Sequence, residues 1–332
     1  MERTWKGRNT LSRSPLAKYI LATLEREYVA SIFQRLVNVY EDRVKTWIIR
    51  YFLRKSGPMQ SSITISLVPE ARQGPFVFHG DLRGAIQSAC RLGFQAVEIF
   101  PRSPDSIPIA ELRSMLAESS LKVSALGTGA GWLVERLTLA DPNPDIRTRA
   151  IDFVRRMIDV AIELGAAAII GSMQGRSSSD APPDRSRGLL RESLETLDRH
   201  ASSSQGRLLY EPLNRYETDQ CNTLAQGREL IQGLGCTQLL ADWFHMNIEE
   251  SNMEQALQDA GPAIGHVHFA DTNRRAIGFG HLDPWPLVET LQRIGYTGYL
   301  SAEVFPAPSS EDSARRTIEA FREMILDPPL RP

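Results

Sequence analysis

The sequence predicts an α/β protein, namely a (β/α)8 barrel with an extra helical arm at its N-terminus. Short β-rich runs alternate with amphipathic helical stretches from about residue 61 onward. Eight such pairs fit into roughly 265 residues, which is the size of one barrel domain. The runs are apolar on both faces, as is typical of parallel strands that are covered by helices.

The eight strands are predicted in chain order as follows. They are ITISL (63–67), AVEIF (96–100), KVSALG (122–127), AAAIIG (166–171), RLLYE (207–211), QLLAD (238–242), GHVHFA (265–270) and GYLSAEVF (298–305). Helices are predicted between them, for example over 149–165 and 313–325, where apolar residues recur at helical spacing. A doubly wound sheet would need a G-x-G-x-x-G turn after a strand. The nearest match, GTGAG at 127–131, lacks the final spacing, so the sequence favours a closed TIM barrel.

Residues 1–58 form a separate basic segment. They hold 12 Lys/Arg against 5 Asp/Glu, a net charge of +7, whereas residues 59–332 carry a net charge of −9. No Gly or Pro interrupts the stretch between Pro15 and Gly57, and apolar residues recur there at helical spacing. We therefore predict a basic amphipathic helical extension over 1–58 and one barrel domain over 59–332.

Three interpretations of this extension stay open. It is a docking arm for a partner or an anionic surface, a helical appendage packed on the barrel, or an upstream extension of the reading frame. The last interpretation arises because Met59 could itself be a start. A closed sheet needs no further element to complete it, so a chain that starts at Met59 is expected to fold.

Composition and charge indicate the class of protein. The net charge of −2 gives no indication of nucleic acid as a partner. No apolar run approaches the length of a membrane span, and no signal-peptide pattern opens the chain. Cys90, Cys221 and Cys236 lie far apart without metal-binding spacing, which is typical of reduced thiols in a cytoplasmic protein.

Metal-competent side chains stand at or near the ends of the last four predicted strands. They are Glu211, Asp242, His268 and Glu303. A single carboxylate at a strand end is ordinarily a helix N-cap or a solvated loop residue. In a barrel, however, strand ends meet at one rim, and three carboxylates around one imidazole would repel each other without a cation. The set suits one divalent ion, Mn²⁺ first, with Mg²⁺ and Co²⁺ as alternatives.

Other candidates rest on weaker patterns. Only one of His266 and His268 is expected to face the barrel interior, with the other facing the helical layer. Arg176, in the stretch GSMQGR, is either an anion-binding residue or a brace for its own loop. The polar, proline-containing segment 177–188 is a candidate lid over the site.

Four stretches in the second half of the chain carry a resemblance to a known family. EPLNRYET, FHMNIEE, HVHFADTNRR and GYLSAEVFP resemble the xylose-isomerase-like TIM-barrel superfamily of sugar isomerases and epimerases. Within it they are most similar to ketose 3-epimerases and 5-keto-gluconate-type epimerases. The resemblance covers roughly residues 61–326, and residues 1–60 have no counterpart in the family.

The resemblance implies roles for seven residues. The metal ligands would be Glu211, Asp242, His268 and Glu303, and the substrate contacts would be Glu217, His245 and Arg274. The spacings agree with the family pattern, with Glu217 six residues after Glu211 and Arg274 six residues after His268. A homo-oligomer, either a dimer or a tetramer, is also expected.

The residues themselves indicate an epimerase chemistry. Epimerising a carbon next to a ketone removes a proton from one face and returns a proton to the other. Glu211 and Glu303 end strands that are three apart in an eight-strand ring, so they can reach a central substrate from opposed sides. One glutamate acts as base and the other as acid, while a cation stabilises the enediolate. The expected function is a metal-dependent epimerase whose small-molecule substrate is a ketose or keto-sugar acid.

Two other functions are kept as alternatives. The same metal site suits an aldose–ketose isomerase that acts on a sugar or sugar phosphate, or an inosose-type dehydratase. A remote alternative is an endonuclease-like DNA-repair barrel, which would need a histidine-rich multi-zinc cluster and a basic face. Before residue 200 the chain offers only His79, and residues 59–332 are acidic.

Overall fold

The structure is a computed structural model that describes residues 59–326. The helical extension predicted over 1–58 and the last six residues of the predicted barrel domain lie outside the described residues. Within 59–326, no helix combines the length and the apolar character that crossing a membrane requires.

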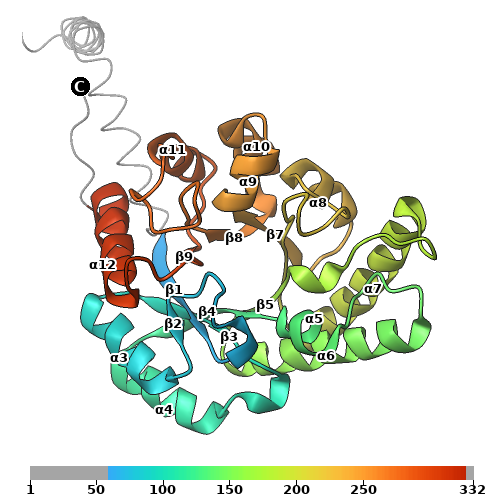
Figure 1. The fold of residues 1–332 in the computed structure, drawn as a ribbon, viewed down its shortest axis with the longest axis horizontal. Helices are drawn as coiled ribbons and strands as arrows, with labels where there is room; N and C mark the ends of the chain where they lie inside the picture. The colour runs from blue at the N-terminus through green and yellow to red at the C-terminus, as the bar shows by residue number, and fades with distance from the viewer. Residues whose placement is uncertain (1–58, 327–332) are drawn as a thin grey trace, which may run out of the picture. The chain divides into compact units, whose positions relative to one another are not determined.

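Eight parallel strands close into a ring with helices outside it (Figure 1). The ring strands are β1 (Gln60–Ser66), β3 (Ala96–Phe100), β4 (Lys122–Gly127), β5 (Ala167–Ile170), β6 (Leu208–Tyr210), β7 (Thr237–Asp242), β8 (Ile264–His268) and β9 (Tyr299–Ala302). The ring closes because β1 pairs in parallel with both β3 and β9. The prediction of a (β/α)8 barrel is therefore confirmed, with each predicted strand in its place.

One further strand was not predicted. The two-residue strand β2 (Phe78–His79) pairs with the end of β1, where Ile65 lies opposite Phe78. A strand of two residues has no detectable periodicity, so only the folded loop after β1 reveals it.

Helices cover the outside of the ring. The α-helices are α3 (Leu82–Leu92), α4 (Ile109–Ser119), α5 (Ala130–Glu135), α6 (Pro144–Glu163), α7 (Pro183–Ser204), α8 (Leu224–Leu230), α9 (Trp243–Glu249), α10 (Met253–Ala260), α11 (Trp285–Arg293) and α12 (Ser310–Phe321). Single turns are η2 (Pro69–Ala71), η3 (Pro104–Ser106), η4 (Ser172–Gln174), η5 (Gly261–Ala263) and the π-helical η6 (Arg322–Leu326). Local capping fixes several of these ends: Asp81 accepts the Gly84 N–H at the start of α3, and Gly93 ends that helix with a φ of 87°.

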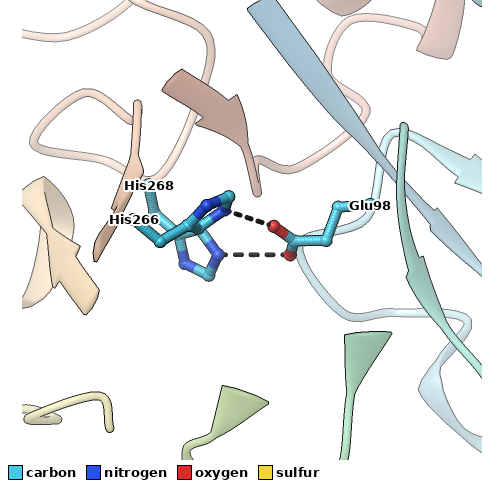
Figure 2. Close-up of side chains that lie close together, drawn as sticks. All are labelled: Glu98, His266 and His268. Carbon is cyan, nitrogen blue, oxygen red and sulfur yellow. Dashed lines mark hydrogen bonds and ion pairs between the residues drawn. The ribbon is translucent and has the colours of Figure 1, made fainter. Parts of the chain in front are cut away.

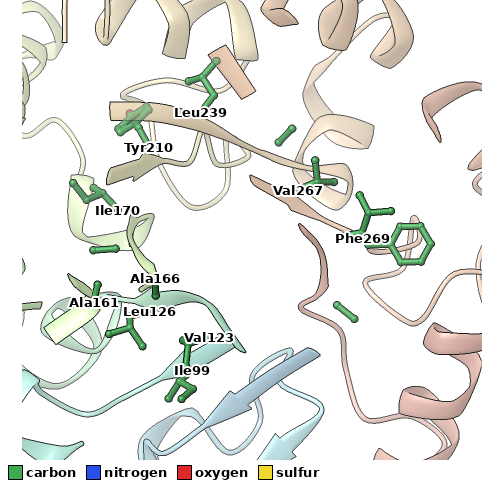
Figure 3. Packing of buried hydrophobic residues seen from close by; sticks show 14 of the residues in the cluster. Ile99, Val123, Leu126, Ala161, Ala166, Ile170, Tyr210, Leu239, Val267 and Phe269 are labelled. Carbon is green, nitrogen blue, oxygen red and sulfur yellow. The ribbon is translucent and has the colours of Figure 1, made fainter. Parts of the chain in front are cut away.

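Alternation along each strand separates an outer apolar layer from the barrel interior. On β3, Val97 and Ile99 belong to the large apolar cluster between strands and helices, whereas Glu98 between them faces the interior. Figure 3 shows part of this layer, with Ile99, Val123 and Tyr210 among the buried side chains. Burial of this layer is the main source of the barrel's stability.

The barrel interior is apolar on one side and polar on the other. Strands β4 to β7 contribute a separate apolar cluster, made of Ala125, Ala167, Ile169, Leu209 and Leu240. The strands β8, β9, β1 and β3 contribute buried polar side chains instead, namely His266, His268, Ser301, Ser62, Thr64 and Glu98. Because buried polar groups are costly unless they are paired, these side chains need partners within the interior.

We expect the barrel to fold without residues 1–55, since all eight ring strands lie within 59–326. Met59 is only 2% exposed, so a chain that starts there would place its charged amino group at a buried position. A chain that starts at Ser56 avoids this cost and should keep the metal content and turnover of the full chain. This expectation is tested by size-exclusion chromatography, elemental analysis and turnover of the shortened chain. A shortened chain that is soluble and metal-loaded but inactive would contradict the expectation.

Candidate active site

The four strand-end residues meet at one point on the rim of the barrel. Asp242 and His268 end β7 and β8 and lie opposite each other in register. Glu211 directly follows β6, and Glu303 directly follows β9. One ligand atom from each of the four lies within 4.8 Å of the others. The sequence prediction that these four residues come together agrees with the structure, whereas their roles stay predictions.

A single imidazole nitrogen faces three carboxylates. His268 Nδ1 lies 3.2 Å from Asp242 Oδ2, 3.3 Å from Glu211 Oε1 and 3.6 Å from Glu303 Oε2. All four residues are buried except for Glu303, whose side chain is 15% exposed. Glu303 is therefore the most accessible of the four side chains.

The electrostatics of the cluster follow from this crowding. Burial raises the pKa of Glu211 to about 7, with the nearby carboxylates of Glu303 and Asp242 adding to the effect and His268 opposing it. Burial alone would lower the pKa of His268, but the surrounding carboxylates outweigh burial and raise it well above its usual value. The carboxylates thus need positive charge, and without a cation only imidazolium and Arg274 supply it.

The donor set fits a divalent cation. Glu211 Oε1 is buried without a hydrogen-bond partner, and a buried carboxylate oxygen left unpaired is costly. A cation among the three carboxylates would supply the missing partner and replace the proton on His268 Nδ1. Three oxygen donors with one imidazole nitrogen suit Mn²⁺, Mg²⁺ or Co²⁺ better than a structural zinc.

Asp242 has two contacts. It caps a helix, which is the ordinary role of a strand-end carboxylate, and it also belongs to the cluster. Its Oδ1 accepts the Phe244 N–H at 2.7 Å and so caps the short helix α9. Its Oδ2 is the oxygen that lies near His268 Nδ1. The cap fixes the carboxylate so that the second oxygen is held toward the cluster.

Glu211 is held in place by a close fit behind it. A Cβ atom on Gly171, which directly follows β5, would lie 2.5 Å from Glu211 Oε2, so a larger residue there would push this carboxylate from its position. Gln174 donates from Nε2 to the Glu211 carbonyl at 3.0 Å, and the Tyr210 hydroxyl donates to Gln174 Oε1 at 2.6 Å. The sequence does not reveal these supporting residues, because they act through another residue rather than at a strand end.

The three residues predicted to contact substrate lie around the same cluster. The Arg274 guanidinium forms an ion pair with Glu303 and lies 3.5 Å from Asp242 Oδ2 and 3.6 Å from Glu217 Oε1. It also lies 4.9 Å from the centre of the Phe244 ring. Arg274 has a φ of 56°, an uncommon left-handed conformation for a residue other than glycine.

His245 is a neutral hydrogen-bond donor aimed at the cluster. Its Nδ1 accepts the Asn214 backbone N–H at 3.1 Å, so the ring proton of the neutral form is on Nε2. Burial, together with the positive charges of Arg274 and His268, lowers the pKa of His245 to about 3, although Asp242 opposes the effect. Nε2 is buried, has no hydrogen-bond partner and lies 3.6 Å from Asp242 Oδ2. Asn214, which the sequence analysis did not assign, therefore sets the tautomer.

The expectation that His266 and His268 face opposite layers is wrong. Both side chains point into the barrel interior and contact Glu98 on β3, as Figure 2 shows. The physical reason is that residues two apart on a strand share one face of the sheet. Glu98 was missed as well, because it lies in the middle of an apolar strand rather than at its end.

The structure shows the surroundings of the two weaker candidates, Arg176 and residues 177–188. Arg176 donates to the backbone carbonyl of Tyr216 at 2.9 Å and of Arg215 at 3.5 Å, which favours the interpretation of Arg176 as a brace. Residues 177–188 are not one loop, because α7 begins at Pro183. A lid role for this segment stays a prediction.

The fold and the site together give the class of this protein. It is a TIM barrel with a cluster of carboxylates and one histidine at its strand ends. Residues 86–324 match the family described as xylose isomerase-like TIM barrel. The chain therefore belongs to that family, as its motifs predicted.

Individual relatives are similar over most of the barrel. The chain is 33% identical over 206 residues to a 3-dehydro-D-guloside 4-epimerase of Escherichia coli K12, covering 59% of this chain and 76% of that protein. It is 28% identical over 251 residues to a ketose 3-epimerase of Arthrobacter globiformis, covering 74% and 85%. The crystal structure of a 3-keto-D-glucoside 4-epimerase from E. coli superposes with a TM-score of 0.65 at 26% identity, covering 79% of this chain and 98% of that one. These relatives are epimerases, and the prediction of an enzyme of the isomerase class is confirmed.

Proposed function

We propose that this protein is a metal-dependent epimerase that inverts a carbon next to the ketone of a ketose or keto-sugar acid. The observation that carries the proposal is the approach of Glu211 and Glu303 to one nitrogen, His268 Nδ1, from strand ends separated by β7 and β8. Two carboxylates from opposite flanks of one centre suit proton removal on one face and proton return on the other.

The names of the relatives support this chemistry. A ketose 3-epimerase inverts the carbon next to a C2 ketone, and a 3-dehydro-sugar 4-epimerase inverts the carbon next to a C3 ketone. Both reactions need the same step, which is loss of a proton made acidic by the neighbouring carbonyl. The position of the ketone differs between the two reactions. In both, one carboxylate is needed to remove the proton and another to return one.

The metal is proposed to be one divalent ion, with Mn²⁺ favoured and Mg²⁺ or Co²⁺ as alternatives, held by Glu211, Asp242, His268 and Glu303. When bound, such an ion polarises the ketone and stabilises the negative charge of the enediolate. Glu211 removes or returns the proton on one face of the substrate, and Glu303 does so on the other, with the roles exchanged in the reverse direction.

The remaining site residues are proposed to orient the substrate. The His245 Nε2–H is an unused donor beside the cluster and is proposed to bind a substrate oxygen. Arg274 provides fixed donors between Glu217 and Glu303, and Glu217 accepts from Asn214 Nδ2 at 3.0 Å. Side chains that are already held by each other lose little freedom when the substrate binds, so they define its geometry.

One surface feature favours an acidic substrate over a neutral one. An open depression on the same rim is lined by Arg72, Asn273, Arg275 and Phe305 among others. Its link to the cluster is through the chain, since Phe305 stands two residues after Glu303 and its N–H donates to the Arg274 carbonyl at 2.8 Å. Within residues 59–326, neither Arg72 nor Arg275 forms an ion pair with a carboxylate, so both guanidinium groups are available to a substrate anion.

Product analysis tests the proposed function. The full chain with Mn²⁺ is incubated with neutral ketohexoses, keto-sugar acids and the matching phosphates, and each product is identified by chromatography and NMR. Epimers are expected, and faster from the acids. An aldose from a ketose would favour the isomerase alternative, and loss of water would favour the dehydratase.

Turnover in D₂O is expected to place deuterium at the epimerised carbon. The proton removed by one glutamate exchanges with solvent, and the proton returned by the other is drawn from solvent. NMR or mass spectrometry of the product measures the incorporation, with the substrate incubated without enzyme as control. Product that lacks solvent deuterium would indicate internal hydride transfer and an isomerase.

The endonuclease-like alternative is less well supported by the site. Within residues 59–326, the two candidate ligand clusters share His268 and contain one further histidine, His266, rather than a histidine-rich multi-zinc set. A homo-oligomer and a cytoplasmic location stay part of the proposal, to be tested by light scattering and by fractionation.

A further inference from the structure

A buried carboxylate lies behind the metal cluster, on the side away from the other carboxylates. Glu98 is in the middle of β3 and is 4% exposed. Its Oε1 lies 3.2 Å from His268 Nε2, and its Oε2 lies 2.8 Å from His266 Nε2. Figure 2 shows the carboxylate extending from β3 toward both rings, one oxygen to each. In the ring of strands, β1 and β9 separate β3 from β8, so this contact crosses the interior.

Glu98, His266 and His268 are close enough to hold an ion, yet their contacts are those of a hydrogen-bonded unit. A carboxylate accepts only, so both Nε2 atoms carry protons and donate to it. No atom of these three side chains is a buried polar atom without a partner, whereas Glu211 Oε1 in the metal cluster and His245 Nε2 beside it are. The three residues satisfy each other, and an ion there would have to break two hydrogen bonds.

We propose that Glu98 is a positioning residue that fixes both the tautomer and the ring orientation of His268 for cation binding. Because Glu98 holds a proton on Nε2, the proton that a cation would displace is the one on Nδ1, and Nδ1 is the atom that faces Asp242, Glu211 and Glu303. The inference rests on the proposed function, because it assumes that the cation binds at this Nδ1.

His266 completes the arrangement by holding Glu98 itself. A carboxylate with one hydrogen bond can turn, but His266 occupies the second oxygen and so fixes the plane of the group. The His266 ring packs edge-on against the His268 ring, with centroids 5.7 Å apart. An ionised carboxylate on the far nitrogen also makes the ligating nitrogen a better donor to a metal.

Glu98→Gln tests the proposal with almost no change of shape. The amide has one acceptor oxygen, so its NH₂ group must face one of the two imidazole rings. If that ring is His268, its Nε2 must become an acceptor, and the proton moves to the Nδ1 that the cation needs. If that ring is His266, His268 Nε2 keeps an acceptor, but a neutral one, so Nδ1 becomes a poorer donor to the metal. We expect Mn²⁺ affinity to fall by about 10- to 100-fold.

The control is Ser124→Ala, a loss of a buried polar group in the same interior. Ser124 on β4 is 3% exposed, and its Oγ bonds to Ser62 Oγ at 2.7 Å and the Val97 carbonyl at 3.3 Å rather than to Glu98 or a histidine. Mn²⁺ affinity is measured by competition with a chelator on metal-free protein, and folding by circular dichroism and thermal melting. Ser124→Ala should bind Mn²⁺ like the unmodified chain.

Each outcome decides the matter. A folded Glu98→Gln variant with unchanged Mn²⁺ affinity overturns the proposal, and so do two Mn²⁺ ions per chain in the unmodified protein. If Glu98→Gln does not fold, Glu98→Asp decides: weakened Mn²⁺ binding at a normal melting temperature supports the proposal, whereas unchanged binding, or failure to fold, overturns it. An unmodified chain that binds no divalent cation would instead refute the proposed function.

Discussion

Replacement of His268 by alanine is expected to remove the divalent cation and almost all activity. The substitution takes away the nitrogen that lies within 3.6 Å of three carboxylate oxygens. The carboxylates then have Arg274 as their remaining close positive partner, so the melting temperature should also fall while the outer apolar layer keeps the barrel folded. Elemental analysis of the purified variant gives the metal content per chain.

His200→Ala is the matched control for this experiment. His200 on α7 forms a hydrogen bond between its Nε2 and Asp159 Oδ1 at 2.7 Å and is not part of the metal cluster. Its removal should leave metal content and turnover unchanged. Full metal occupancy in the His268→Ala variant would show that His268 is not a ligand. The proposed metal site would then have to be assigned to other residues.

Replacement of Glu303 by glutamine is expected to lower kcat by about 10²- to 10⁴-fold, which is the usual contribution of a general acid or base. The amide keeps the length and one oxygen of Glu303 but cannot carry a proton to or from the substrate. It also weakens the ion pair with Arg274. The measurement is made at saturating Mn²⁺, so that a loss of metal affinity does not enter the comparison.

Glu311→Gln serves as the control for the Glu303 variant. Glu311 lies on α12 and pairs with Arg91 at 3.1 Å and Arg315 at 3.3 Å in an exposed position. Its kcat should equal that of the unmodified chain. An unchanged kcat in Glu303→Gln at full metal occupancy would show that Glu303 moves no proton, and one-base or hydride-transfer chemistry would replace the two-glutamate scheme.

The differences between prediction and structure lie in local geometry rather than in architecture. The expected orientation of His266 was wrong because two residues along a strand return to the same face. The roles of Glu98 and Asn214 were missed because their partners come from β8 and α9, which are distant in the chain. Neither residue belongs to a sequence motif whose spacing indicates a catalytic or metal-binding site.

The sequence by itself determined the barrel and the four ligand candidates. Apolar runs separated by amphipathic helices specify parallel strands, and a barrel brings the ends of successive strands to one rim, so Glu211, Asp242, His268 and Glu303 could be grouped by position alone. Only the tertiary structure decided which nitrogen of each histidine faces the cluster. That choice depends on the hydrogen bond at the opposite nitrogen, from Asn214 to His245 Nδ1 and from His268 Nε2 to Glu98. Such bonds join residues 31 and 170 positions apart in the chain, and no local pattern encodes a contact that folding alone creates.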